Sequence, residues 1–161
     1  MTSVPLVVEE RVAAVARERL GSAVEEVKVE HRGRISITAR KETARDVATC
    51  LREMGFDHTI AVAGVDYPIE KRIEVIYFVS SFSSGDLKHV VVSLRINLDR
   101  DKPSMQTLTP IWESASFFER EAYEMFGVDF EGHPNLQKLL LQDNWDGPPP
   151  LRKDLRIPEM A

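Results

Sequence analysis

The chain has 161 residues, of which 43% are hydrophobic and 29% are charged, and its formal net charge at pH 7 is −5. This length and composition predict one globular domain with a hydrophobic core plus an extension, and argue against a disordered chain. The acidic balance argues against nucleic acid or an anionic lipid surface as a partner, because both attract a basic face.

The sequence contains no signal for disulfide bonds, secretion or a membrane span. Cys50 is the only cysteine, so no disulfide can form within the chain, and we expect a reducing, intracellular environment. The N-terminal residues lack the basic and apolar segments of a signal peptide. The longest apolar run, residues 60–65, is far shorter than the roughly 20 residues that a membrane helix requires.

Two helices are predicted in the first third of the chain. Residues 3–20 and 43–54 each repeat apolar side chains at helical spacing. Each repeat is closed by a glycine, Gly21 and Gly55, at the place where helices commonly end. Cys50 lies beside the apolar stripe of the second helix, so we expect a buried thiol.

Five segments alternate apolar and polar residues as strands do. We expect strands over residues 24–29, 35–37, 59–65, 69–80 and 87–98. The turns between them are predicted at 32–34, 66–68 and 80–86, where Gly, Pro, Asp and Ser gather. The first two strands read as a hairpin, and the last three as an antiparallel sheet with one wet face.

A further helix signal follows a polar linker at residues 99–104. Thr109 is a suitable N-cap and Pro110 a suitable first helical residue. Apolar side chains then repeat at helical spacing over residues 111–125, and Gly127 ends the pattern. The sequence therefore predicts one long helix between Thr109 and Gly127.

The last segment, residues 128–161, is predicted to be an extended tail, because prolines interrupt it. It still carries many leucines, which must be buried against this domain or a partner. We therefore expect three parts: an α+β domain at 1–104, a motif helix at 105–127 and a partner-binding tail at 128–161. The fold class is α+β, with two helices packed on one face of a mainly antiparallel sheet.

Two interpretations remain open for the charged residues of the motif helix. Glu121 and Glu124 share a helix face and His133 follows after a turn, so a free-standing metal-dependent enzyme is one alternative. The Glu-x-x-His and His-Glu-x-x-His spacings of known metal sites are absent. The pattern favours the other interpretation, in which Arg120 and the carboxylates form ion pairs or hydrogen bonds that fix the helix to a neighbour.

The two tryptophans are assigned different roles. We expect Trp112 in the core and Trp145, in the extended tail, as an interface anchor. Leu151 is predicted to anchor the end of the tail, while Arg152 contacts a carboxylate or a backbone terminus on a partner.

Three ordered segments resemble the signature of a known family. They are Glu119-Arg120-Glu121-x-x-Glu124-Met125-Phe126-Gly127, then Phe130-x-Gly132-His133-Pro134-x-Leu136 with Leu139-Leu140, and finally Trp145-x-Gly147 with Pro150-Leu151-Arg152-Lys153-Asp154. This order is similar to the 30 kDa subunit family of respiratory complex I, the NADH–quinone oxidoreductase. That family has relatives in deazaflavin-linked dehydrogenases and membrane-bound nickel–iron hydrogenases.

The resemblance implies a structural subunit without a catalytic, cofactor or metal site of its own. It would belong to the peripheral arm of an oxidoreductase that couples electron transfer to ion translocation, on the cytoplasmic side of the membrane. Iron–sulfur clusters and quinone, or a nickel–iron centre, would then lie in partner subunits. The alternative is the same scaffold role in a membrane-bound nickel–iron hydrogenase or formate hydrogenlyase.

The partners implied are the large quinone-site (or hydrogenase-like) subunit and the small subunit that holds a 4Fe–4S cluster. The residues expected at the partner interface are Glu119, Arg120, Glu121, Glu124, Phe130, His133, Pro134, Leu136, Trp145, Leu151, Arg152, Lys153 and Asp154.

Overall fold

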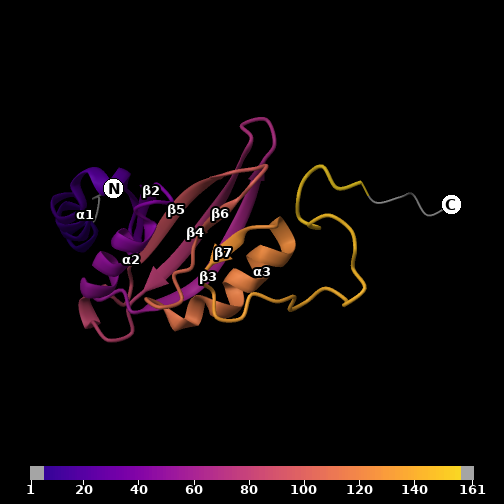
Figure 1. The fold of residues 1–161 in the computed structure, drawn as a ribbon. Helices are drawn as coiled ribbons and strands as arrows, with labels where there is room; N and C mark the ends of the chain where they lie inside the picture. Colours follow the sequence, from indigo (N-terminus) through magenta and orange to yellow (C-terminus); the bar gives the residue numbers. More distant parts are fainter. Residues whose placement is uncertain (1–5, 157–161) are drawn as a thin grey trace.

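The computed structural model describes residues 6–156, which form one sheet with helices beside it and a long C-terminal tail (Figure 1). The elements are α1 (Val7–Leu20), η1 (Gly21–Ala23), β1 (Val24–His31), β2 (Arg34–Ala39), α2 (Ala44–Glu53), β3 (His58–Tyr67), β4 (Arg72–Ser80), η2 (Gly85–Leu87), β5 (Val91–Asp99), β6 (Ser104–Gln106), η3 (Glu113–Ala115), α3 (Ser116–Phe126) and β7 (Asp129–Glu131). The predicted start of the first helix, residues 3–5, lies outside the described residues.

The main sheet has five strands in the order β1-β2-β5-β4-β3. The pairs β1–β2, β3–β4 and β4–β5 are antiparallel, as predicted, whereas β2 and β5 are parallel. The α+β class and the mainly antiparallel sheet are therefore confirmed. The edges of the sheet are β1 and β3, which lie far apart in the sequence.

The helices cover one face of this sheet. Strand residues that point to that face, such as Ile37, Val75 and Leu94, are fully buried. Val47 and Leu51 of α2 belong to the same hydrophobic core.

The opposite sheet face is polar along its middle. There Arg95 donates a hydrogen bond to Ser36 at 3.1 Å and lies 3.3 Å from Glu74. The alternation of apolar and polar residues along each strand thus sets one dry face and one wet face.

One predicted turn is wrong. The sequence places a turn at 66–68, but β3 continues through Tyr67, and the turn spans Pro68 to Lys71. The strand is extended by distant partners, because the Asp66 carboxylate binds Arg100 and the Arg72 guanidinium lies 3.6 Å from the centre of the Tyr67 ring.

The predicted long helix is also wrong in its start. The α-helix begins at Ser116, and the preceding residues form a turn and the short η3. Trp112 has an extended backbone (φ −127°, ψ 96°), and its indole N–H donates to the Phe56 carbonyl oxygen at 2.8 Å in the core. Burial of this large side chain therefore overrides the local Thr109-Pro110 start signal.

A second, two-stranded sheet joins the segments on either side of α3. β6 and β7 pair in parallel, so the residues just before the helix lie beside those just after it. Trp112 is fully buried and Cys50 is buried, which confirms both core predictions.

Candidate partner-binding surface

The motif helix α3 is fixed to the sheet by a buried carboxylate, Glu119. Its side chain is fully buried. Tyr77 Oη and the Leu108 N–H donate to one carboxylate oxygen, at 2.8 and 2.9 Å, and Thr107 Oγ1 donates to the other. Burial raises the pKa of Glu119, although these hydrogen bonds oppose the shift. The same surroundings raise the pKa of Tyr77 well above its ordinary value.

His133 connects the start of the tail to the start of α3. Its side chain is fully buried and lies 4.0 Å from Glu119. Nε2 is 3.0 Å from the Ser116 carbonyl oxygen, and Nδ1 accepts the Asn135 N–H at 3.0 Å. These contacts fit an imidazole that carries its proton on Nε2, so His133 here ties two backbone segments together.

Two charged residues of α3 bind the backbone of the tail. Glu124 accepts hydrogen bonds from the three N–H groups of residues 139–141, each at 2.9 Å. Arg120 donates to the carbonyl oxygens of Gln137 and Lys138 at 3.1 and 3.0 Å. Burial alone would raise the pKa of Glu124, but the three N–H donors lower it overall. The leucine-rich segment is thus held by hydrogen bonds to ionised groups, which are stronger than neutral ones.

The tail returns to the C-terminal end of α3. The Leu151 N–H donates to the Met125 carbonyl oxygen at 3.0 Å, and Arg152 Nε donates to that of Phe126 at 2.8 Å. Gly127 follows the helix with φ 75°, a left-handed conformation that favours glycine. Arg152 therefore caps the last carbonyls of the helix, where a cation is favourable.

The end of the described tail is bound to β3 and β5. Asp66, almost fully buried, accepts two hydrogen bonds from Arg100, at 2.7 and 2.9 Å, and one from the Lys153 N–H at 2.8 Å. Arg100 also lies 3.0 Å from Asp154. The hydrogen bond from Arg100 is the main cause that lowers the pKa of Asp66 and of Asp154.

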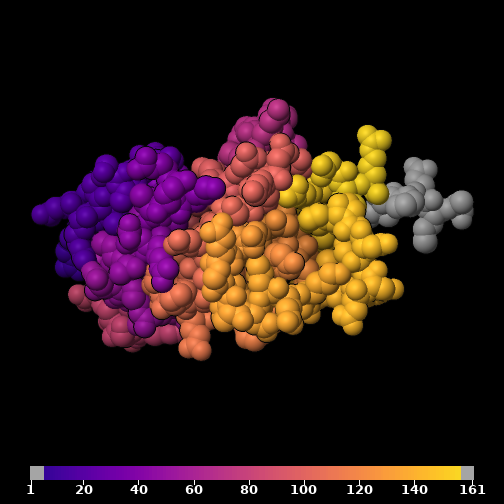
Figure 2. Space-filling view, in the orientation of Figure 1, coloured from indigo at the N-terminus to yellow at the C-terminus, as the bar shows by residue number. Residues whose placement is uncertain are grey.

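With its backbone bound to the domain, the tail turns large apolar side chains outward. We call Leu139, Leu140, Trp145 and Leu151 the tail apolar surface; their exposed fractions are 38%, 60%, 37% and 53%. In Figure 2 the tail, coloured orange to yellow, covers one end of the molecule. Several large apolar side chains gathered on one ordered segment are typical of a protein interface.

The predicted interface residues fall into three groups. Glu119, Glu124 and Phe130 are buried in this chain. Arg120, His133, Leu136 and Arg152 are half-buried as whole residues, and Glu121, Pro134, Trp145, Leu151, Lys153 and Asp154 are exposed. The buried carboxylates fit the interpretation in which α3 is fixed to a neighbour, and that neighbour is the chain's own sheet and tail. Contacts of the other residues with a partner stay a prediction.

Sequence reasoning missed Asp66 and Arg100 as residues that hold the tail. They lie far apart in the sequence, and Asp66 contacts Lys153 from the far end of the chain. No local pattern predicts such a contact. The only signal is the Asp-Tyr-Pro element, which by itself favours a turn.

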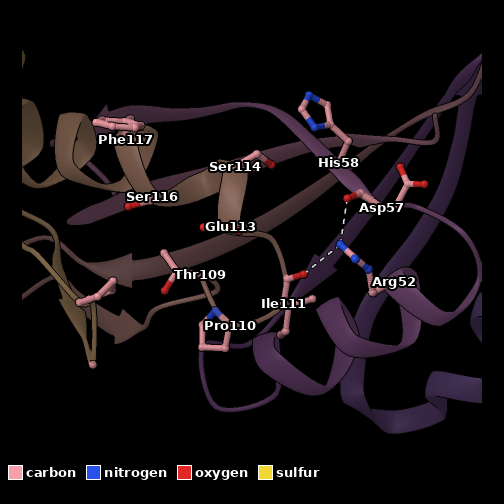
Figure 3. A pocket seen from close by; sticks show the side chains of 12 residues that line it. Arg52, Asp57, His58, Thr109, Pro110, Ile111, Glu113, Ser114, Ser116 and Phe117 are labelled. Atoms are coloured by element: carbon pink, nitrogen blue, oxygen red, sulfur yellow. Dashed lines mark hydrogen bonds between the residues drawn. The ribbon is translucent and has the colours of Figure 1, made fainter. Parts of the chain in front are cut away.

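The largest cavity, about 870 Å³, lies between α2, η3 and the start of α3. Figure 3 shows that Arg52 points across it and donates to the carbonyl oxygens of Asp57 and Ile111, at 2.9 and 3.1 Å. His58 lies against Phe82, with ring centroids 4.3 Å apart. The polar groups of this cavity are therefore largely engaged with the chain itself.

The metal alternative proposed Glu121, Glu124 and His133 as ligands. The structure does not bring them together, because Glu124 binds the tail backbone and His133 binds Ser116 and Asn135. Within residues 6–156, no group of three His, Cys, Asp or Glu side chains is placed to hold a metal ion.

The fold and this surface define an α+β protein whose C-terminal tail is held on its own helix with apolar side chains exposed. The chain belongs to the family described as respiratory-chain NADH dehydrogenase, 30 kDa subunit, whose model matches residues 37–160. It is part of a complex I-type, membrane-bound respiratory complex. Over the part of the chain that the structure describes, no helix is long and apolar enough to span a bilayer.

Two curated relatives illustrate the range of this family. The chain is 39% identical over 155 residues to the C subunit of NADH-quinone oxidoreductase from Roseiflexus sp. strain RS-1, covering 94% of this chain and 83% of that protein. It is 36% identical over 133 residues to the C subunit of F(420)H(2) dehydrogenase from Methanosarcina mazei, covering 82% of each.

Solved structures agree with this assignment. A chain of the membrane-bound sulfane sulfur reductase, an archaeal respiratory membrane complex, has a TM-score of 0.80 at 26% identity and covers 92% of this chain and 85% of its own. A trypsin-resistant fragment of Nqo5 has a TM-score of 0.66 at 29% identity and covers 80% of this chain and 99% of its own.

A fused relative is also informative. The C/D subunit of NADH-quinone oxidoreductase from Bdellovibrio bacteriovorus is 43% identical over 120 residues, which cover 73% of this chain and 20% of that protein. In that relative, a segment similar to this chain is part of a much longer polypeptide with a double designation.

Proposed function

We propose that this chain is a cofactor-free assembly subunit of the peripheral arm of its complex, on the cytoplasmic side of the membrane. Its tail apolar surface binds the large quinone-site subunit and the small 4Fe–4S subunit. Iron–sulfur clusters and quinone, or a nickel–iron centre, are held by those partners. The chain itself contributes binding and positioning and carries no catalytic group.

One observation carries this proposal: the tail is held in place by the chain's own helix, with its apolar side chains outward. Leu139 and Leu140 are exposed while their N–H groups are bound by Glu124. A segment fixed in this way loses little conformational entropy on binding, which favours affinity. The fused C/D relative supports the large subunit as one of the partners.

The test is co-purification from gently solubilised membranes with a tagged chain. Leu140→Gln removes an exposed apolar group of the tail, and Val7→Gln removes one of similar exposure, 63% against 60%, on α1. We expect Leu140→Gln to lower the recovery of the large and small subunits about tenfold, the effect of losing one interface anchor.

Val7→Gln is expected to leave the recovery unchanged, and both variants keep the melting temperature of the isolated chain. Equal recovery with both variants would contradict the role of the tail. Stoichiometric metal in the isolated chain would contradict the cofactor-free assignment.

A further inference from the structure

The two edges of the main sheet differ sharply in sequence. β1 carries four charged residues in its middle, Glu25, Glu26, Lys28 and Glu30. β3 carries no charged residue from Thr59 to Val65. Charges on an edge strand prevent another strand from pairing with it, because pairing would bury them. The β1 edge is therefore protected against strand addition, and the β3 edge is not.

The outer side of β3 is free along most of its length. Within residues 6–156, β3 pairs only with β4, and no further backbone–backbone hydrogen bond involves residues 60–67. At its start, the Thr59 N–H donates to Ser114 Oγ at 3.0 Å. In a strand, alternate N–H and C=O groups face each side, so the free side offers a row of unpaired donors and acceptors. Another extended segment satisfies such a row best.

A groove of about 230 Å³ runs beside this edge, between β3 and α3. Its lining residues are Val62, Ala63, Gly64, Glu121, Ala122, Met125, Phe126 and Leu151. Most of this lining is apolar, while the exposed Glu121 forms no ion pair with any residue in the described range. The groove thus accepts an apolar side chain and places a free carboxylate beside it.

We propose that the outer edge of β3 accepts an extended segment of a partner subunit as an additional strand. One apolar side chain of that segment enters the groove, and a basic residue faces Glu121. Leu151 belongs to both this groove and the tail apolar surface, so the two form one continuous binding surface. The inference rests on the proposed function, because the segment comes from another member of the same complex.

A second copy of this chain fits the edge less well. β3 itself has no Lys or Arg to meet Glu121, and β1 would bring Glu25, Glu26 and Glu30 towards it. The chain is acidic overall, with a net charge of −5. Like charges across an interface oppose pairing, which favours a partner segment of basic or neutral character.

The first test is amide hydrogen exchange of the isolated full-length chain and of the same chain in the purified complex. We expect peptides that cover residues 58–67 to exchange more slowly in the complex, while peptides of residues 24–31 stay unchanged. Equal exchange of residues 58–67 in both samples would overturn the inference. Protection that appears in the concentrated isolated chain would also overturn it, because it would indicate pairing between two copies.

The second test compares Ala63→Lys with Val7→Lys in the co-purification. Ala63 is half-buried on β3 and pairs with Ile76 on the wet face of the sheet, so a lysine there reaches solvent without entering the core. We expect Ala63→Lys to lower partner recovery about tenfold and Val7→Lys to leave it unchanged. If the wild-type chain recovers no partner, the proposed function fails; if Ala63→Lys recovers the partners as well as wild type does, only the strand inference fails.

Discussion

Arg120 and Glu124, one turn apart on α3, bind opposite backbone groups of the same tail segment. Arg120 takes the carbonyl oxygens of residues 137–138, and Glu124 takes the N–H groups of residues 139–141. A single helical turn thereby satisfies five backbone groups that have no partner in a helix or strand. The leucine side chains that follow are left free to face outward.

Replacing Glu124 should loosen this segment. Glu124→Gln removes the negative charge that three N–H groups share, so we expect the free energy of unfolding to fall by about 1–3 kcal/mol. Urea denaturation measures the loss, and trypsin should cut faster after Lys138. Glu121→Gln on the same helix is the control, with an expected change within about 0.5 kcal/mol because its side chain is exposed. Equal effects of both variants would contradict the role of Glu124.

Glu119 should make stability depend on pH in an unusual direction. Burial raises its pKa in the folded state above the ordinary 4.5, so the folded chain binds this proton more tightly than the unfolded chain. Its contribution to stability is complete below pH 4.5 and is lost as the pH rises through the raised pKa.

Glu119→Gln resembles the protonated acid and cannot titrate. The wild-type free energy of unfolding minus that of Glu119→Gln should therefore fall as the pH increases above 4.5. Urea denaturation at a series of pH values measures this difference. A difference that does not change with pH would contradict the raised pKa.

Asp66 should show the opposite trend. The hydrogen bond from Arg100 lowers its pKa below the ordinary 3.8, so its contribution is present above pH 3.8 and is lost as the pH falls through the lowered value. Asp66→Asn should cost about 1–3 kcal/mol near neutral pH and flatten the acid side of the stability curve. The expected sign is a difference from wild type that shrinks on acidification. A difference that grows would show that other carboxylates dominate.

Gly64 is predicted to be intolerant of any side chain. A Cβ at this position would lie 2.4 Å from Cδ2 of the Phe126 ring, so either the ring or β3 must move. Gly64→Ala should lower the free energy of unfolding by about 1–3 kcal/mol, as overpacking does. Gly85→Ala is the matched control, because no atom lies within 4 Å of its Cβ position.

A double variant identifies the cause. Adding Phe126→Leu should recover part of the loss caused by Gly64→Ala, because the two residues share one contact and their effects do not add. Thermal unfolding of the four chains measures this coupling. Fully additive effects would show that the ring is not what Gly64 accommodates.

Apolar periodicity predicts the early part of the fold well. α1, α2 and the β1–β2 hairpin follow from side chains such as Val47, Leu51, Ile35 and Ile37, whose spacing alone sets a buried face. The parallel pairing of β2 with β5 could not be predicted in this way, because pairing partners far apart leave no local pattern.

The errors share one physical reason, which is long-range burial. Thr109 and Pro110 look like the start of a helix, yet Trp112 is drawn into the core and delays it to Ser116. Likewise, the sequence predicts an extended tail, but the binding of that tail to Arg120 and Glu124 depends on a fold that brings them together. The motif could identify those residues as important without showing that they act within the chain.

The tail is a closed loop and not a free arm, because Leu151 and Arg152 return to the carbonyl oxygens of Met125 and Phe126. Closing such a loop costs entropy that grows only with the logarithm of its length, so doubling the loop would add about 0.6 kcal/mol. Extra residues near Asp143 should therefore be tolerated while Leu139 and Leu140 keep their place. Loop length can thus vary to suit different partners at little cost to the stability of the domain.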